Sequence, residues 1–139
     1  MDISLQQVGY LYGKDSPFEK RALHEVDATI HSGSYTAIIG HTGSGKSTLL
    51  MHLNGLLKPS EGIVKIGDAT ITAGTKAKRL KEVRRHVGIV FQFPEHQLFE
   101  ETVEKDIMFG PMNFGVDKEE ARRRAHELIE QLGLPKEIA

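Results

Sequence analysis

A glycine-rich octapeptide limits the possible folds of this chain more than any other feature. Gly40-His41-Thr42-Gly43-Ser44-Gly45-Lys46-Ser47 fits the pattern G-x-x-x-x-G-K-[ST]. Its glycines let the main chain curl so that successive N–H groups face one point, and a helix that follows adds its own free N–H groups. Such a ring of amides attracts anions, and phosphate in particular. The octapeptide therefore predicts a phosphate-binding loop between a strand and a helix.

Individual residues of this loop have separate predicted roles. Lys46 brings a full positive charge to the β- and γ-phosphates of a nucleotide, and the Ser47 hydroxyl is a ligand for Mg²⁺. Thr48 is a further donor on the side of the α-phosphate. The predicted nucleotide-binding residues of the loop and of the first helical turn are Gly40, His41, Thr42, Gly43, Ser44, Gly45, Lys46, Ser47 and Thr48.

The flanking residues predict the strand–loop–helix setting that the motif requires. Residues 35–39 are a β-branched run without alternation, which is typical of a strand covered on both faces. Residues 46–54 carry leucines at helical spacing, and Gly55 stands where a helix ends. Further along we expect a strand at 63–68, a short basic helix at 75–85 and a second buried strand at 87–91.

The two ends of the chain carry patterns of their own. Residues 3–12 alternate with one slip between Leu5 and Val8, which predicts a strand with a bulge. A second alternating stretch ends at Ile30, so we expect an antiparallel hairpin. The clearest helix is predicted after Asp117, which forms a D-x-x-E capping pair with Glu120.

Composition excludes several classes of function. With 139 residues the chain is one domain or a piece of one, and its formal charge of −1 shows no basic excess that would favour nucleic acid as a partner. It has no cysteine, so thiolate metal sites and cysteine nucleophiles are excluded. No apolar run approaches the roughly 20 residues of a membrane-spanning helix. We therefore expect a soluble chain.

Residues 35–62, YTAIIGHTGSGKSTLLMHLNGLLKPSEG, resemble the Walker A region of ATP-binding cassette (ABC) ATPases. The resemblance implies an α/β fold: part of a P-loop NTPase core, with an N-terminal antiparallel β-subdomain and the start of a helical subdomain. It also implies ATP and Mg²⁺ as ligands. In this family an aromatic residue before the loop stacks on adenine; Tyr12 matches that position best, and Phe18 is the alternative.

Residues 90–94, VFQFP, resemble the Q-loop of the same family. The resemblance implies that Gln92 touches Mg²⁺ and the attacking water, which makes Lys46 and Gln92 the expected catalytic residues and Ser47 and Gln92 the expected metal ligands. We expect residues 1–92 to form the N-terminal part of the nucleotide-binding domain, through the Q-loop, and residues 93–139 to form the Q-loop exit and the start of the helical subdomain.

Residues 92–103, QFPEHQLFEETV, and 109–115, FGPMNFG, resemble the energy-coupling factor (ECF) branch with its CbiO-type ATPases, and specifically the second of its paired ATPase subunits. The insertion SPFEKRAL at 16–23 is similar. This resemblance implies hydrolysis of MgATP for the uptake of vitamins or transition-metal ions at the cytoplasmic face of a membrane. It implies three partners: a second ECF ATPase in a heterodimer, a transmembrane coupling subunit bound through the Q-loop region, and a separate substrate-capture membrane subunit.

An apolar-rich segment follows the Q-loop without strict periodicity: Leu98, Phe99, Val103, Phe109 and Phe114. Two interpretations stay open. These side chains either form a groove for a helix of the coupling subunit, as the family resemblance implies, or pack the helical subdomain against the core.

Several family motifs do not occur after Gln92: the LSGGQ signature, the Walker B Asp-Glu, the D-loop and the switch histidine. We expect the chain to be the N-terminal portion of a longer ATPase that does not hydrolyse ATP by itself. Three alternatives remain: a P-loop enzyme of another branch, such as a small-molecule kinase or a GTPase; an ABC ATPase of the DNA-repair type; and a non-catalytic binding module.

Overall fold

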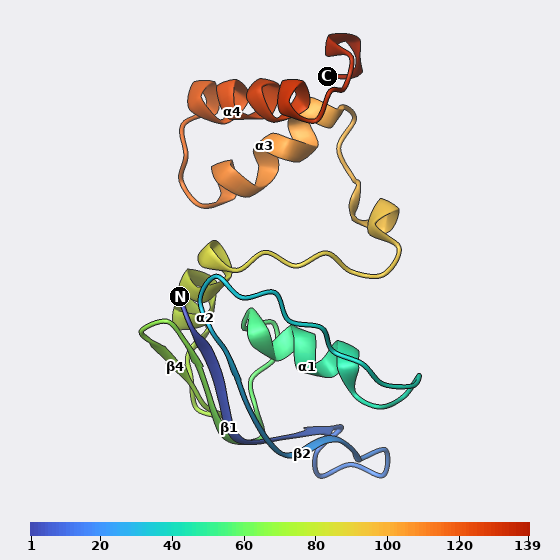
Figure 1. Cartoon of the computed structure of the whole chain (residues 1–139), viewed down its shortest axis with the longest axis vertical. Helices are drawn as coiled ribbons and strands as arrows, with labels where there is room; N and C mark the ends of the chain where they lie inside the picture. Colours follow the sequence, from blue (N-terminus) through green and yellow to red (C-terminus); the bar gives the residue numbers. More distant parts are fainter. The chain divides into compact units, whose positions relative to one another are not determined.

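The computed structural model describes all 139 residues and divides into two compact units, Met1–Ile89 and Val90–Ala139 (Figure 1). The first unit is built on a four-stranded antiparallel sheet with the strand order β2-β1-β3-β4. In it β1 (Ile3–Tyr12) lies between β2 (Lys20–Ile30) and β3 (Glu61–Ile66). The short strand β4 (Ala69–Ile71), which the sequence did not predict, closes the far edge. The predicted N-terminal hairpin is confirmed.

The slip in the alternation of β1 is a bulge, as predicted. Leu5 pairs with Ala28 and Val8 pairs with Val26, so three steps along β1 face two steps along β2. Gln7 takes up the extra residue with φ at 50°. Leu5 and Val8 consequently lie in the same buried cluster, although strict alternation would place them on opposite faces.

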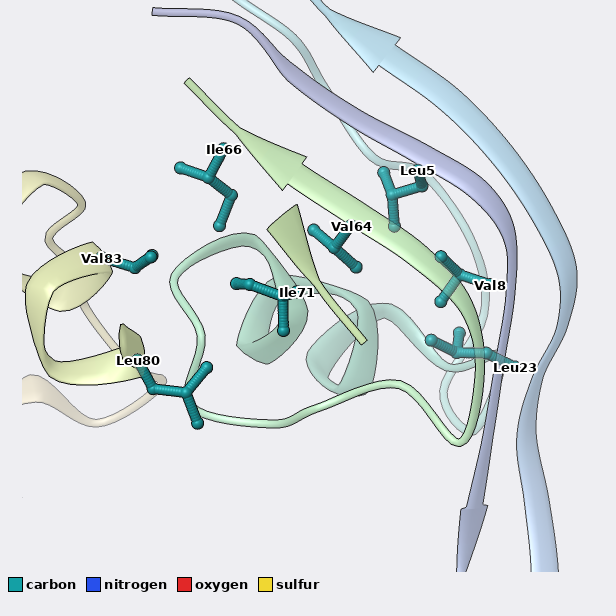
Figure 2. Close-up of a cluster of buried hydrophobic side chains, with 8 residues drawn as sticks. All are labelled: Leu5, Val8, Leu23, Val64, Ile66, Ile71, Leu80 and Val83. Atoms are coloured by element: carbon teal, nitrogen blue, oxygen red, sulfur yellow. The ribbon is translucent and has the colours of Figure 1, made fainter. Parts of the chain in front are cut away.

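The core of the first unit forms where the sheet meets two helices. Helix α1 (Lys46–Leu53) contributes Leu49 and Leu53, and α2 (Ala77–His86) contributes Leu80 and Val83. Figure 2 shows eight buried side chains from the four strands and α2 gathered into one cluster. Both helices were predicted, and Gly55 follows α1 with φ at 75°, the left-handed conformation expected after a helix end.

Two predicted buried strands, at 35–39 and 87–91, are wrong. Both segments are irregular. Tyr35, Ile39 and Val90 are 102%, 94% and 76% exposed, respectively. Neither segment makes a backbone hydrogen bond to a neighbouring strand. An apolar run becomes a strand only when a second strand pairs with it, and the local pattern does not reveal whether that partner exists.

The second unit is mainly helical. Its elements are η1 (Pro94–Gln97), α3 (Val103–Asn113), α4 (Lys118–Gln131) and η2 (Lys136–Ile138). A small buried cluster of Met108, Ala121 and Ala125 joins α3 to α4. Helix α3 was not predicted, because Gly110 and Pro111 interrupt the pattern in its last turn. No helix in either unit is both long enough and apolar enough to cross a membrane.

Helix α4 begins as predicted, but its cap differs from the expected pair. The Asp117 carboxylate accepts a hydrogen bond from the Glu119 amide at 3.1 Å. Glu120 does not reach back to close the capping box and instead binds Arg123 and Arg124. These guanidinium groups, Arg123 first, lower the pKa of Glu120 from 4.5 to about 2.

Candidate functional site

The glycine-rich loop leads into α1, and close packing against β2 explains one of its glycines. Gly45 is the N-cap of α1, with φ at 98°. A Cβ atom at Gly45 would lie 2.8 Å from the carbonyl oxygen of Ala22 on β2. Gly43, with φ at 85°, turns the chain in the same loop. The sheet of the first unit therefore fixes where the loop and the start of α1 lie.

The amides of the loop are largely uncommitted. One turn bond is present, from the Ser44 amide to the His41 carbonyl at 3.2 Å. The other amides from Thr42 to Thr48 donate to no protein acceptor: those of Thr42, Gly43, Gly45, Lys46, Ser47 and Thr48. Amides without a protein acceptor at a helix N-terminus provide the donors that an anion requires.

The Lys46 ammonium lies over its own loop. It donates to the carbonyl oxygens of Gly40 and His41, the latter at 2.8 Å, and approaches the Ser44 hydroxyl at 3.4 Å. These are neutral acceptors, so the positive charge has no carboxylate partner. A bound phosphate would offer the ammonium a full negative charge in their place.

Ser47 fits the predicted role of a Mg²⁺ ligand. Its side chain is exposed and makes no hydrogen bond, so the hydroxyl is available. Nowhere do three or more His, Asp or Glu side chains gather into a group that could hold a metal ion. Mg²⁺ in nucleotide sites is typically held by one or two protein oxygens together with phosphates and water. The donor set therefore suits a Mg²⁺ ion that arrives with a nucleotide.

Of the two aromatic candidates, Tyr12 is the one that contacts α1, the helix that follows the loop. Tyr12 ends β1, is 38% exposed, and its hydroxyl lies 2.9 Å from the Thr48 hydroxyl in α1. Phe18 lies in the β1–β2 connection and is 86% exposed. The structure thus brings Tyr12 and Thr48 together.

Two residues beside this pair were not predicted, His52 and Tyr10. His52 is fully buried in α1; its Nδ1 lies 2.7 Å from the Thr48 carbonyl oxygen, while its Nε2 has no partner. Burial lowers the pKa of His52, although the hydrogen bond to the Thr48 carbonyl opposes the shift. The Tyr10 ring packs edge-on against His52, with centroids 5.0 Å apart. A histidine four positions after Thr48 was the only hint in the sequence.

Gln92 belongs to the second unit, where it is exposed in a bend before η1. The same unit exposes large apolar side chains, with Leu98 67% and Phe99 62% accessible. Phe99 packs edge-on against Phe109 at a centroid distance of 4.7 Å. Beside them is a hollow of 450 Å³ lined by Glu100, Lys105, Met108, Phe109, Met112, Asn113 and Lys118.

Comparison with protein families matches residues 23–138 to the family described as "ABC transporter". An energy-coupling factor transporter ATP-binding protein, EcfA2, of Listeria monocytogenes is 64% identical over 138 residues, which are 99% of this chain and 48% of that protein. The EcfA2 of Geobacillus kaustophilus is 59% identical over 99% of the chain and 48% of its own length. The chain thus spans about half the length of these relatives. They confirm the predicted resemblance to the second ECF ATPase.

Solved structures agree with the predicted P-loop NTPase fold. A dimeric ATP-binding cassette, MJ0796, in a post-hydrolysis state bound to ADP and Pi, matches with a TM-score of 0.82 and 30% identity, over 99% of this chain and 60% of that one. The cbiO1 protein of Clostridium perfringens, described as part of the ABC transporter complex cbiONQ, matches with a TM-score of 0.76 and 32% identity, over 98% and 51%.

Proposed function

The chain belongs to the ABC transporter family, and from this premise we propose that it is the ATP-binding part of an energy-coupling factor importer. The relatives named EcfA2 and the match to cbiO1 support this assignment. In the proposed whole protein, binding and hydrolysis of MgATP energise uptake of vitamins or transition-metal ions. A small-molecule kinase, a GTPase and a DNA-repair ATPase gain no support from these relatives.

One observation carries the proposal: the loop before α1 has free amides and a lysine without a carboxylate partner. Residues 40–48 hold the triphosphate, and Tyr12 stacks on the base. On binding, Lys46 exchanges its loop carbonyls for phosphate oxygens. When bound, Mg²⁺ would supply charge neutralisation at the phosphates, and the Ser47 hydroxyl would be its protein ligand in the first unit. For Gln92 a role as Mg²⁺ ligand is only what the family resemblance implies.

Hydrolysis needs more than the residues present. Phosphoryl transfer depends on positioning and on charge stabilisation from all sides of the phosphate. Lys46 would supply one part of that stabilisation, and the family resemblance implies a part for Gln92; the sequence contains no signature motif or Walker B carboxylate. We therefore propose that this chain alone binds ATP but turns it over only at background rate.

The second unit is proposed to contact the membrane partner. Leu98, Phe99 and Phe109 are exposed and lie outside the buried α3–α4 cluster, which favours a docking surface over internal packing. The partners would be a second ECF ATPase, a transmembrane coupling subunit at this surface and a substrate-capture subunit, at the cytoplasmic face of the membrane. In functional terms, residues 1–92 would carry the nucleotide loop and residues 93–139 would begin the helical subdomain.

Equilibrium binding of a fluorescent ATP analogue tests the proposed function. Lys46→Ala removes the charged donor and should weaken binding about tenfold to a hundredfold. Lys65→Ala is the matched control. Lys65 is exposed on β3, so this substitution removes the same positive charge at a place outside the loop. Equal binding by wild type, Lys46→Ala and Lys65→Ala would contradict the proposal.

A further inference from the structure

A single hydrogen bond connects the end of β1 to the first turns of α1. The Tyr12 hydroxyl lies 2.9 Å from the Thr48 hydroxyl across 36 positions of sequence. Thr48 is 7% exposed, whereas Tyr12 is 38% exposed, so the bond joins a buried group to a partly open ring. Thr48 lies in the first turn of α1, which directly follows the phosphate loop.

The chemistry of the two hydroxyls sets the direction of this bond. A phenol is the stronger acid, with a pKa near 10, and is therefore the better donor. When Tyr12 donates, Thr48 accepts through a lone pair and keeps its own proton free. A helical threonine otherwise tends to donate that proton to the carbonyl four residues earlier, here Ser44.

The Thr48 main chain is fixed as well. Its carbonyl accepts a hydrogen bond from Nδ1 of the buried His52 at 2.7 Å, because a carbonyl can only accept. Burial favours the neutral imidazole, and the bond to the carbonyl requires its one proton to lie on Nδ1. Both the carbonyl and one lone pair of the Thr48 hydroxyl are thus occupied by neighbouring side chains.

The Tyr12 ring is held at two points. Its hydroxyl is bound to Thr48, and its ring packs against that of Tyr10 in a T-shaped arrangement, with centroids 4.8 Å apart and planes at 83°. The Tyr10 hydroxyl makes no hydrogen bond. A partly exposed ring with a fixed orientation can stack on a flat ligand with little further loss of side-chain entropy.

We propose that the Tyr12 hydroxyl is a positioning group that couples base binding to phosphate binding. It holds the ring ready to stack on a purine and leaves the Thr48 proton free for a phosphate oxygen. The inference rests on the proposed nucleotide site and adds a defined role for an atom away from the phosphates. Base and phosphate recognition would then depend on each other through one bond.

Binding of MgATP and of magnesium tripolyphosphate, measured by titration calorimetry on the full chain, tests this proposal. Tyr12→Phe keeps the ring but removes the bond, and should weaken MgATP binding about fivefold to tenfold. Tripolyphosphate, which has no base, should lose less affinity. Thr48→Val should weaken both ligands, and Thr48→Ser should restore binding. Tyr35→Phe is the matched control, because it removes a hydroxyl from a fully exposed side chain that makes no hydrogen bond, and it should bind both ligands as wild type does.

The double variant Tyr12→Phe/Thr48→Val separates coupling from simple addition. The proposal requires that it bind MgATP no more weakly than the weaker single variant, because both changes break the same bond. Additive losses, wild-type MgATP affinity in Tyr12→Phe, or equal losses for the two ligands would overturn it. If Lys46→Ala loses binding while Tyr12→Phe does not, this inference alone falls. If wild type binds no MgATP, the proposed function falls with it.

Discussion

The first unit gathers eight buried apolar side chains from four strands and a helix into one cluster, whereas the second buries three in its cluster and leaves Leu98, Phe99 and Phe109 exposed. In the first unit the packed sheet fixes the glycine-rich loop, since β2 touches Gly45 and β1 touches Thr48. In the second unit the apolar surface is open. The first unit therefore has the larger packed core, and we expect substitutions there to affect stability more than substitutions at the exposed apolar side chains of the second unit.

The largest effect is expected from the core of the first unit. Ile71 is fully buried on β4, so Ile71→Ala should lower the free energy of unfolding by about 2–5 kcal/mol. Leu98→Ala, in the second unit, should change it by less than about 0.5 kcal/mol, because that side chain is exposed. Urea denaturation measures both. If Ile71→Ala and Leu98→Ala lowered the free energy of unfolding by similar amounts, the two units would not differ in how much these side chains contribute to stability.

Phe99→Asp tests the open surface of the second unit. The charge should weaken assembly with the membrane partner about tenfold or more, since burying one large apolar side chain contributes about 1.5–3 kcal/mol. Binding of the ATP analogue should not change. Leu132→Asp makes the same change at a side chain that is 71% exposed at the end of α4, and should leave assembly intact. Unfolding of Phe99→Asp instead would show that Phe99 is a packing residue.

Asp117→Ala tests how much the N-cap of α4 contributes to the stability of the second unit. Loss of the bond to the Glu119 amide should destabilise α4 by about 1 kcal/mol, as measured by thermal unfolding. Asp117→Asn keeps an acceptor and should have a much smaller effect. If Asp117→Ala and Asp117→Asn lost equal stability, the charge of the carboxylate, and not its hydrogen bond to the Glu119 amide, would stabilise the start of α4.

The smallest effect concerns pH. Glu120 has a folded pKa of about 2 against 4.5 without its arginine partners, so the unfolded chain takes up a proton first as the pH falls. Stability from this group is present above pH 4.5 and is lost as the pH falls toward 2. Glu120→Gln should flatten the stability profile in that window, and added salt should reduce the difference. An unchanged profile would show that these ion pairs do not affect stability.

The sequence pattern predicted those parts of the molecule whose conformation is decided by residues close together in the sequence. The bulge between Leu5 and Val8 and the loop before α1 follow from alternation and from glycine spacing. The segments at 35–39 and 87–91 were predicted as strands, because their composition suits a sheet interior, but pairing depends on a second strand.

The candidate site shows the same limit. Tyr12 was chosen by family resemblance, and its contact with Thr48 could not be foreseen from sequence because it spans 36 positions. His52 was missed because nothing in a helical leucine pattern distinguishes a buried histidine from an exposed one. Helix α3 was missed because its last turn carries Gly110 and Pro111. Only the contact between Tyr12 and Thr48 joins residues that are distant in sequence; α3 was obscured by helix-breaking residues within it.

The free amides between His41 and Thr48 are the feature of the molecule on which the proposed nucleotide binding depends most. Backbone amide chemical shifts of the isotope-labelled chain, followed during titration with MgATP, test them directly. The resonances of Thr42, Gly43, Gly45, Lys46 and Ser47 should move together and saturate, while those of α4 stay in place. Unmoved loop resonances at saturating MgATP would contradict the phosphate cradle.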